Sequence, residues 1–232
     1  MSRVIFITGA RKGIGLALTK HYLARGDTVV GCSREMSDLK HAAYSHYAFD
    51  VADEAAVVNC FRDVSKNHGR LDALINNAGR ASMNHALLTP AATLSSLFAT
   101  NALGSFICLR EGAKLMQKRK TGRIVNFTSV AVPLNLEGEM AYAASKAAVE
   151  SITRIAAREL GPFGITVNAV GPTPVDTDLI KGVPADRLKA LLARQAIPRM
   201  GLPDDVAQAV DFFLDDKSGF ITGQVLYLGG VG

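Results

Sequence analysis

A glycine-rich turn between a short apolar run and a helical pattern constrains this chain most. Residues Val4–Thr8 read VIFIT, which is typical of a buried parallel strand. Gly9, Gly13 and Gly15 follow, and an amphipathic helical pattern then continues to Gly26. Such a turn lets backbone N–H groups approach a phosphate at the start of the helix. The pattern predicts a nucleotide-binding βα unit, with an ordinary glycine-rich turn as the alternative.

The same alternation of apolar runs and helical patterns continues to the end of the chain. Seven runs have the length and composition of strands, and helical patterns separate most of them. Strands that alternate with helices form a parallel sheet covered on both faces. We therefore predict one α/β domain, residues 1–232, with a doubly wound sheet of about seven parallel strands. The predicted strands are Val4–Thr8, Asp27–Ser33, His46–Phe49, Leu71–Asn76, Arg123–Ser129, Gly164–Val170 and Gln224–Leu228.

Composition narrows the class of protein. The chain is 48% hydrophobic, which suits a sizeable core and excludes a disordered chain. The net charge of +5 is mild, and aromatic residues make up only 6% of the chain, so a nucleic-acid-binding surface has no support. The three cysteines form no CxxC pair and are predicted to be reduced core residues. The five histidines lack metal-ligand spacing, so no metal site is expected.

Signals for export or membrane insertion are not recognised in the sequence. The N-terminus passes from Met1, Ser2 and Arg3 into the first predicted strand without the apolar segment of a signal peptide. No apolar run is judged long enough to span a bilayer. We expect a cytoplasmic protein that binds no membrane.

The residues after the second predicted strand bear on which nucleotide binds. In dinucleotide-binding folds, a carboxylate about 20 residues past the glycines binds the ribose 2′-OH of NAD. Here Ser33 and Arg34 stand at that point, and an arginine pairs with a 2′-phosphate. Arg11 and Lys12 in the glycine turn add positive charge. We predict NADP(H), assuming that Glu35 points away from the nucleotide. The alternative is that Arg34 is a solvated loop residue.

A tyrosine and a lysine share one face at the start of a later helical pattern. Tyr142 and Lys146 lie four residues apart in YAASKAAVESITRIAAREL. A unit charge about 4 Å away contributes on the order of 4 kcal/mol at an effective dielectric of about 20. That interaction would bring the pKa of a tyrosine, ordinarily about 10, near neutrality. The pair is therefore a candidate acid/base device. A packed tyrosine beside a solvated lysine is the plainer interpretation.

Other candidate residues fall at the carboxyl ends of the predicted strands, where ligands of such sheets bind. Asn101 lies instead within a predicted helix from Thr89 to Lys118. A buried amide in a helix needs a partner or a function, and a structural hydrogen bond that kinks the helix is the alternative. The strand ends gather Thr8, Gly9, Ser33, Arg34, Asn76–Gly79, Ser129 and Val170–Pro172 in one predicted crevice.

Together these motifs resemble those of the short-chain dehydrogenase/reductase family, over essentially the whole chain. TGARKGIG matches the family's TGxxxGIG, and NNAG at Asn76–Gly79 is matched in full. Ser129, Tyr142 and Lys146 have the spacing of the catalytic serine and the YxxxK motif. Asn101 falls where the family has its fourth catalytic residue. The C-terminal ITGQVLYLGG is similar to that of 3-oxoacyl-carrier-protein reductases. The resemblance implies a Rossmann-type fold and an NADP-preferring enzyme.

The resemblance also implies a role for each catalytic residue. Tyr142 would donate a proton to a substrate carbonyl oxygen, or accept one in the reverse reaction. Lys146 would lower the pKa of the tyrosine and hold the nicotinamide ribose. Ser129 would orient the carbonyl, and Asn101 would hold a water in a proton relay. The implied reaction is NADPH-dependent reduction of a ketone or 3-oxoacyl-like carbonyl, or the reverse.

A set of cofactor contacts is implied in the same way. Asp50 and Val51 resemble the family's adenine-contacting pair, and VNAVGPTPVDT resembles its nicotinamide loop, with Thr173 where relatives have glycine. Relatives are often tetramers built on two long helices, so a homo-oligomer, dimer or tetramer, is expected. The implied contacts are Gly9, Arg11, Lys12, Gly13, Ile14, Gly15, Ser33, Arg34, Asp50, Val51, Asn77, Ala78, Gly79, Tyr142, Lys146, Pro172, Val175 and Thr177.

The sequence leaves the substrate and the direction of reaction open. Residues Val130–Met140 and the segment after Thr177 offer a mostly apolar wall, which suits acyl chains, steroids, cyclic ketones or aldehydes about equally. An NADP+-linked alcohol dehydrogenase is one alternative. A catalytically idle NADP(H)-binding sensor or scaffold is another, since fold alone does not determine function. The intact Asn–Ser–Tyr–Lys set favours an enzyme.

Overall fold

The chain folds as a parallel sheet between two layers of helices. The computed structural model describes residues 2–177, 180 and 182–231. Within these residues seven parallel strands pair in the order β3-β2-β1-β4-β5-β6-β7, which confirms the predicted doubly wound α/β fold. The strands are β1 (Val4–Thr8), β2 (Thr28–Ser33), β3 (Tyr44–Ala48), β4 (Ala73–Asn76), β5 (Gly122–Phe127), β6 (Ile165–Gly171) and β7 (Val225–Tyr227).

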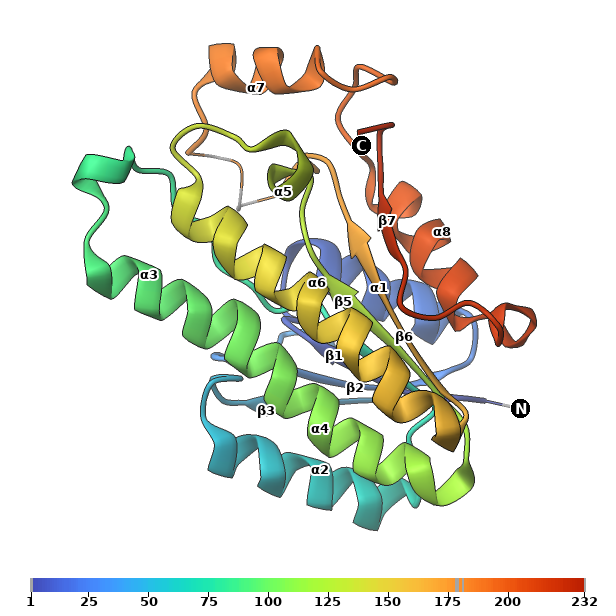
Figure 1. Ribbon diagram of the computed structural model, residues 1–232. Helices are drawn as coiled ribbons and strands as arrows, with labels where there is room; N and C mark the ends of the chain where they lie inside the picture. The colour runs from blue at the N-terminus through green and yellow to red at the C-terminus, as the bar shows by residue number, and fades with distance from the viewer. Residues whose placement is uncertain (1, 178–179, 181, 232) are drawn as a thin grey trace.

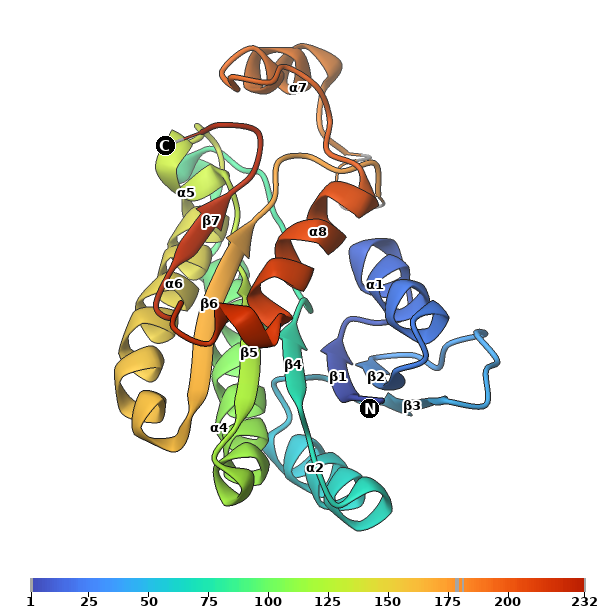
Figure 2. The same ribbon diagram turned by 90° about the vertical axis from the view of Figure 1, so that its right-hand side faces the viewer.

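Helices cover both faces of this sheet. Figures 1 and 2 show α2, α4 and α6 along one face and α1 with α8 along the other. Helix α7 lies apart from both layers, beyond the carboxyl ends of the strands. The helices are α1 (Gly13–Ala24), α2 (Glu54–His68), α3 (Ala91–Leu97), α4 (Gly104–Met116), α5 (Ala131–Leu134), α6 (Met140–Leu160), α7 (Ala185–Leu192) and α8 (Pro203–Leu214).

Strand β1 builds both halves of the core because successive side chains of a strand point to opposite faces. Phe6 packs toward α2, where its ring stacks on Phe61 with the centroids 4.6 Å apart. Ile5 and Ile7 pack on the other face against α1 and α8. Burying each such side chain contributes about 1.5–3 kcal/mol. The cysteines are free and buried, as predicted, at Cys32, Cys60 and Cys108.

The predicted helix with Asn101 is continuous from Ala91 to Arg119, but its middle, Phe98–Leu103, is π-helical. By length and composition this helix could cross a membrane, so the statement that no apolar run is long enough was wrong. In the fold it packs against α2, α6 and the sheet. A helix in the core of a globular protein commonly has the same length and apolar composition.

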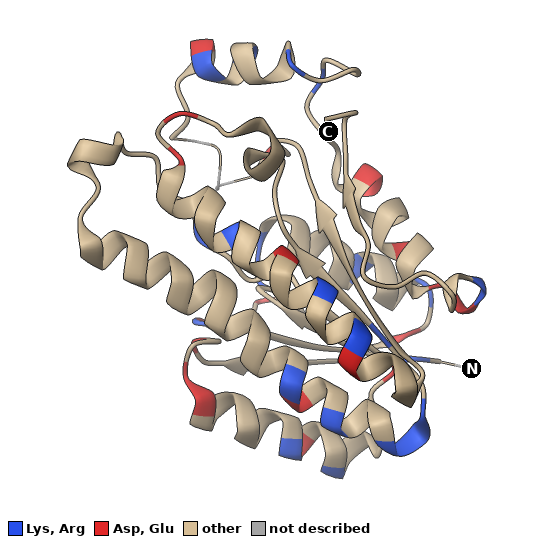
Figure 3. Ribbon diagram, in the orientation of Figure 1, with Lys and Arg blue, Asp and Glu red and all other residues tan. Residues whose placement is uncertain are grey.

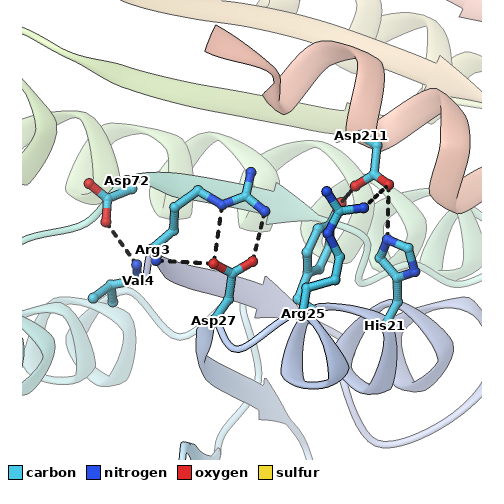
Figure 4. Close-up of polar contacts among 8 residues, drawn as sticks. Arg3, Val4, His21, Arg25, Asp27, Asp72 and Asp211 are labelled. Carbon is cyan, nitrogen blue, oxygen red and sulfur yellow. Dashed lines mark hydrogen bonds and ion pairs between the residues drawn. The ribbon is translucent and has the colours of Figure 1, made fainter. Parts of the chain in front are cut away.

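Ion pairs fasten the N-terminal strand and α1 to their surroundings (Figure 4). Asp211 on α8 accepts hydrogen bonds from Tyr22 and Arg25 and contacts His21 Nε2 at 2.9 Å. Asp27 binds the Arg3 guanidinium, with an N–O distance of 2.7 Å. The Asp211 contacts fix α1, whose first turn carries the predicted glycine motif, against α8.

Charged side chains are otherwise dispersed. Figure 3 shows Lys and Arg interspersed with Asp and Glu along α2 and α4, with basic residues at the turn that follows α4. Pairs such as Arg110–Glu54, 2.8 Å apart, neutralise part of this surface. The chain thus carries its charge of +5 without one dominant basic face in this view.

Candidate active site

Two adjoining cavities run along the carboxyl ends of the strands. The larger, of about 410 Å³, lies over the glycine turn and the ends of β2 and β3. The smaller, of about 170 Å³, lies by the ends of β5 and β6 and the start of α6. Their walls have residues in common, so they form one crevice at the edge that the sequence predicted. The shared residues are Ile14, Asn77, Gly79, Arg80, Ala81 and Thr177.

Three of the four predicted catalytic residues line the smaller cavity. Tyr142 and Lys146 lie one turn apart near the start of α6, and Ser129 follows the end of β5. The side chains of Tyr142 and Ser129 are hydrogen-bonded. Lys146 Nζ donates to the carbonyl oxygen of Phe127 at 2.8 Å. All three residues are at least nine-tenths buried, so packing holds them in one geometry.

The titration behaviour of the pair differs from the expectation. Burial raises the pKa of Tyr142 to about 12, while the hydrogen bond with Ser129 lowers it and the charge of Glu139 raises it. Burial lowers the pKa of Lys146 to about 8. The expectation that Lys146 brings the tyrosine pKa near neutrality is therefore wrong for this structure. The physical reason is that desolvation of the phenol dominates, while the ammonium binds the Phe127 carbonyl.

Asn101 lies in the π-helical segment and is fully buried. Its Nδ2 donates to the Arg80 carbonyl and to Ser145 Oγ, both at 2.9 Å, and its Oδ1 accepts from the Arg80 N–H at 2.8 Å. A Cβ added to Gly79 would lie 3.3 Å from both Asn101 Oδ1 and Lys146 Nζ. The amide thus braces the loop after β4 beside the lysine. This is the structural role that the sequence left open, and the water relay stays a prediction.

The glycine turn packs closely on the loop that follows β4. Asn77 Nδ2 donates to the carbonyl oxygens of Thr8 and Gly9, at 2.9 and 3.3 Å, and the Ala78 N–H donates to Thr8 Oγ1 at 2.9 Å. A Cβ on Gly15 would overlap the Gly9 carbonyl oxygen and lie 2.6 Å from Asn77 Nδ2. Only glycine fits there, because a side chain would separate the glycine turn from the loop after β4.

The far end of the larger cavity carries the residues that were predicted to contact the 2′ position of the cofactor's ribose. Ser33, Arg34, Arg11 and Lys12 all line it, as predicted. Glu35 lines it as well, and its Oε2 lies 2.7 Å from Arg11 Nη2. The assumption that Glu35 points away was wrong, because the arginine of the neighbouring turn attracts its carboxylate. Arg11, Lys12 and Arg34 outnumber the two carboxylates that line the same cavity, Glu35 and Asp50, so its lining is positive on balance.

The remaining predicted cofactor contacts also reach the crevice. Asp50 and Val51 line the larger cavity after β3, where Asp50 Oδ1 accepts the Ala52 N–H at 3.0 Å and fixes the turn. Pro172, Val175 and Thr177 line the smaller cavity after β6. The structure therefore gathers both predicted ends of a dinucleotide site along one edge of the sheet.

Thr173, which stands where the resemblance implies a glycine, has a specific hydrogen-bond partner. Its Oγ1 donates a hydrogen bond to Gln195 Oε1, and both residues are buried. Gln195 Nε2 in turn donates to the Arg199 carbonyl at 3.2 Å. The threonine thus fastens the loop after β6 to the segment after α7.

Comparisons with known proteins agree with this geometry. A family model described as enoyl-(acyl carrier protein) reductase matches residues 9–230. The 3-oxoacyl-(acyl-carrier-protein) reductase FabG of Salmonella typhimurium is 30% identical over 234 residues, covering 98% of this chain and 96% of FabG. The chain belongs to the short-chain dehydrogenase/reductase family. The predicted family and its oxidoreductase class, acting on CH–OH and C=O groups, are thereby confirmed.

Two further proteins are similar to this chain over nearly its whole length. The hydroxy(phenyl)methylsuccinyl-CoA dehydrogenase subunit BbsD of Thauera aromatica is 35% identical over 239 residues, covering 99% of this chain and 96% of BbsD. Among solved structures, ElxO with NADP bound has a TM-score of 0.90 and 30% identity, covering 98% of this chain and 97% of ElxO. A variant of ElxO was solved with NADPH bound.

Sequence reasoning about this dehydrogenase/reductase missed one acidic residue that lines the crevice and another that is buried near Lys146. Glu139 falls inside the segment Val130–Met140, which was predicted to be a mostly apolar wall, yet it lines the smaller cavity beside Tyr142. Glu150 is buried one turn after Lys146 and accepts hydrogen bonds from Thr128 Oγ1, at 2.8 Å, and from the Tyr227 hydroxyl. Its spacing from Lys146 was the available signal, because positions i and i+4 share a face.

Proposed function

We propose that this chain is an NADP(H)-dependent carbonyl reductase in which Tyr142 is the general acid. The observation that carries the proposal is the convergence, in one crevice, of the Tyr142–Ser129 pair with the glycine turn at the start of α1. At neutral pH a phenol with a pKa of about 12 is protonated, which is the state that a proton donor needs.

The residues of the crevice fit a dinucleotide phosphate. Gly15 lets the Gly9 carbonyl and the Asn77 side chain pack against the first turn of α1, and Gly79 lets Lys146 Nζ approach the loop after β4. The turn after β1 would hold the pyrophosphate through backbone N–H groups. Arg34, Arg11 and Lys12 would bind the 2′-phosphate, and Lys146 would bind the nicotinamide ribose.

Within this site, each catalytic residue has a task set by its surroundings. When bound, NADPH supplies the hydride. Ser129 holds the Tyr142 hydroxyl by a hydrogen bond and would place the substrate oxygen beside it. Tyr142 would then donate its proton to that oxygen. Lys146, held against the Phe127 carbonyl, lies one turn away, where its ammonium would stabilise the resulting phenolate.

The smaller cavity favours a substrate with an apolar body next to its carbonyl. Its wall beyond the catalytic residues is mostly aliphatic, with Glu139 and Arg80 as the charged exceptions. The names of FabG and BbsD specify substrates attached to acyl-carrier protein and to coenzyme A. We therefore place 3-oxoacyl thioesters first, ahead of cyclic ketones and aldehydes.

The direct experiment is a panel of carbonyl substrates assayed by the loss of NADPH absorbance. The panel contains a 3-oxoacyl thioester, a cyclic ketone and an aliphatic aldehyde, and the corresponding alcohols are tested with NADP+. We expect substrate-dependent oxidation of NADPH, fastest with the thioester. Tight NADPH binding without turnover of any member in either direction would contradict the proposal and favour an idle cofactor-binding protein.

The reductive activity is expected to fall as pH rises through about 8. Burial lowers the pKa of Lys146 to about 8, so its ammonium is present below that pH and is lost above it. Tyr142, with a pKa of about 12, remains protonated over this range and does not cause the fall. The measurement is kcat/KM for reduction against pH, which reports groups of the free enzyme. A flat profile to about pH 10 would contradict the assignment to Lys146.

Two charge substitutions are expected to move cofactor preference in opposite directions. Arg34→Asp replaces a cation with an anion in the larger cavity and should reduce the preference for NADPH over NADH by roughly tenfold or more. Glu35→Gln removes the carboxylate that pairs with Arg11 and should raise the preference severalfold. The ratio of the two dissociation constants measures both effects. Equal affinities for NADPH and NADH in the unsubstituted protein would contradict the proposed cofactor.

The proposed enzyme is a cytoplasmic homo-oligomer, as expected for the family. Large apolar side chains are exposed on the outer face of the two long helices, and such a face commonly packs against a second copy. These residues are Leu94, Leu103, Phe106, Met140 and Ile155.

A further inference from the structure

A histidine that the proposed chemistry does not use lies behind the ribose end of the crevice. His46 is on β3, next to β2, and its ring is about half-buried. Its Nε2 lies 2.8 Å from Ser33 Oγ and 3.2 Å from the Glu35 carbonyl oxygen. Its Nδ1 lies 2.6 Å from the Tyr44 hydroxyl. One imidazole thus connects Tyr44, on the edge strand of the sheet, to Ser33, which lines the larger cavity.

The surrounding acceptors determine where the ring carries its proton. Ser33 Oγ donates to the Glu35 carbonyl oxygen at 2.8 Å, so it presents a lone pair to His46. A carbonyl oxygen can only accept. Nε2 therefore carries a hydrogen, and in the neutral ring Nδ1 accepts from the Tyr44 hydroxyl. A second proton would go to Nδ1, with Tyr44 becoming the acceptor and donating instead to Ser37, its other partner.

Burial and nearby charges together favour the neutral form of the His46 ring. Burial lowers the pKa of His46, the backbone of Glu35 raises it, and the charge of Arg11 lowers it. Arg34 and the Glu35 carboxylate line the cavity in front of Ser33, and Lys40 and His41 precede β3 on the other side. A phosphate placed against Ser33 would reverse this balance, because a nearby anion favours the protonated imidazole.

We propose that His46 is a positioning residue for the 2′-phosphate of NADP(H), acting through the Ser33 hydroxyl, and that it takes up a proton when the phosphate binds. The proposal rests on the proposed cofactor. With Nε2–H donating to Ser33 Oγ, the serine proton is free to turn from the Glu35 carbonyl to a phosphate oxygen. The protonated ring then adds a positive charge one hydrogen bond behind the phosphate.

The test is the pH dependence of the preference for NADPH over NADH, measured as the ratio of their dissociation constants from about pH 8 to about pH 6. The ratio cancels every contact that the two cofactors share. In the unsubstituted protein the preference should rise about fivefold to tenfold as pH falls over this range. His46→Gln keeps an amide donor for Ser33 but cannot take up a proton. The rise should therefore disappear in this variant.

A matched control separates this effect from titration of the phosphate itself. His41→Gln removes another histidine of the same region, whose ring accepts only the Ala43 N–H in the contacts described, and should keep the pH dependence of the unsubstituted protein. The second pKa of a phosphate ester is about 6, and its protonation weakens binding equally in all variants. The same pH dependence in His46→Gln as in the unsubstituted protein would overturn the proposal.

A second measurement covers the case in which His46→Gln does not fold. Ring protons of the five histidines are followed by NMR titration of the unsubstituted protein with NADP+ and with NAD+. We expect one histidine pKa to rise with NADP+ only, and Tyr44→Phe to move that titration to higher pH. No shift with bound NADP+ would overturn the role of His46. Failure of NADPH and NADP+ to bind at any pH would instead refute the proposed function.

Discussion

Tyr142→Phe is expected to lower kcat by about 10²- to 10⁴-fold while leaving the affinity for NADPH within a few fold. The substitution removes the hydroxyl bonded to Ser129 and keeps the aromatic ring, which is buried among the residues of the smaller cavity. Folding and cofactor binding should therefore survive, and only the proton donor is lost. The measurements are kcat on the best panel substrate and the dissociation constant of NADPH.

The control for that variant is the same chemical change made elsewhere. Tyr47→Phe removes a phenol on β3 outside both cavities and should keep kcat within about twofold. If Tyr142→Phe retained most of its kcat, another group would have to supply the proton. Glu139, which lines the same cavity and whose pKa is raised by burial, would be the first residue to examine.

Gly15→Ala is expected to weaken NADPH binding by about 100-fold or more. The added Cβ would overlap the Gly9 carbonyl oxygen and press on Asn77, so the turn before α1 would have to move. Asn77 Nδ2 donates to the carbonyl oxygens of Thr8 and Gly9, which holds both neighbours in place. Overpacking of this kind typically costs about 1–3 kcal/mol of stability. Titration with NADPH and urea unfolding measure the two effects.

Gly161→Ala is the matched control, because no heavy atom lies within 4 Å of a Cβ at that position and its φ of −52° suits alanine. It should leave the dissociation constant unchanged and should not lower the unfolding midpoint. Unaltered NADPH affinity in Gly15→Ala would mean that the cofactor phosphates lie away from the glycine turn.

Much of the fold was predictable because its signals are local and repeated. The run VIFIT became β1 with the predicted boundaries, and the repeated alternation of strands and helices became a seven-stranded parallel sheet. Boundaries were less accurate at β3, which begins at Tyr44 because pairing with Val29 of β2 extends it beyond its own apolar residues.

The candidate site was predictable in its members and less so in its electrostatics. The spacing of Tyr142 and Lys146 predicts that they lie one turn apart, but it does not predict how deeply they are buried. Burial raises the pKa of Tyr142 and lowers that of Lys146. The pairing of Glu35 with Arg11 joins two turns separated by a whole βα unit, and no local pattern encodes it. The role of His46 was not predicted, because its partners are Ser33, on the neighbouring strand β2, and Tyr44, two positions earlier on β3.

The π-helical segment around Asn101 changes the direction in which side chains point before and after it in the long helix. A π-helical turn holds one residue more than an α-helical turn, and each residue of an α-helix rotates the side-chain direction by about 100°. The apolar face of α3 is therefore rotated about the helix axis relative to that of α4. The continuous helix thus packs different faces against α6 and against the sheet. Deleting one residue from Phe98–Leu103 would change the rotation of this part of the helix, and the Asn101 side chain would then point away from Arg80. Length in this segment is therefore as constrained as the identity of its asparagine.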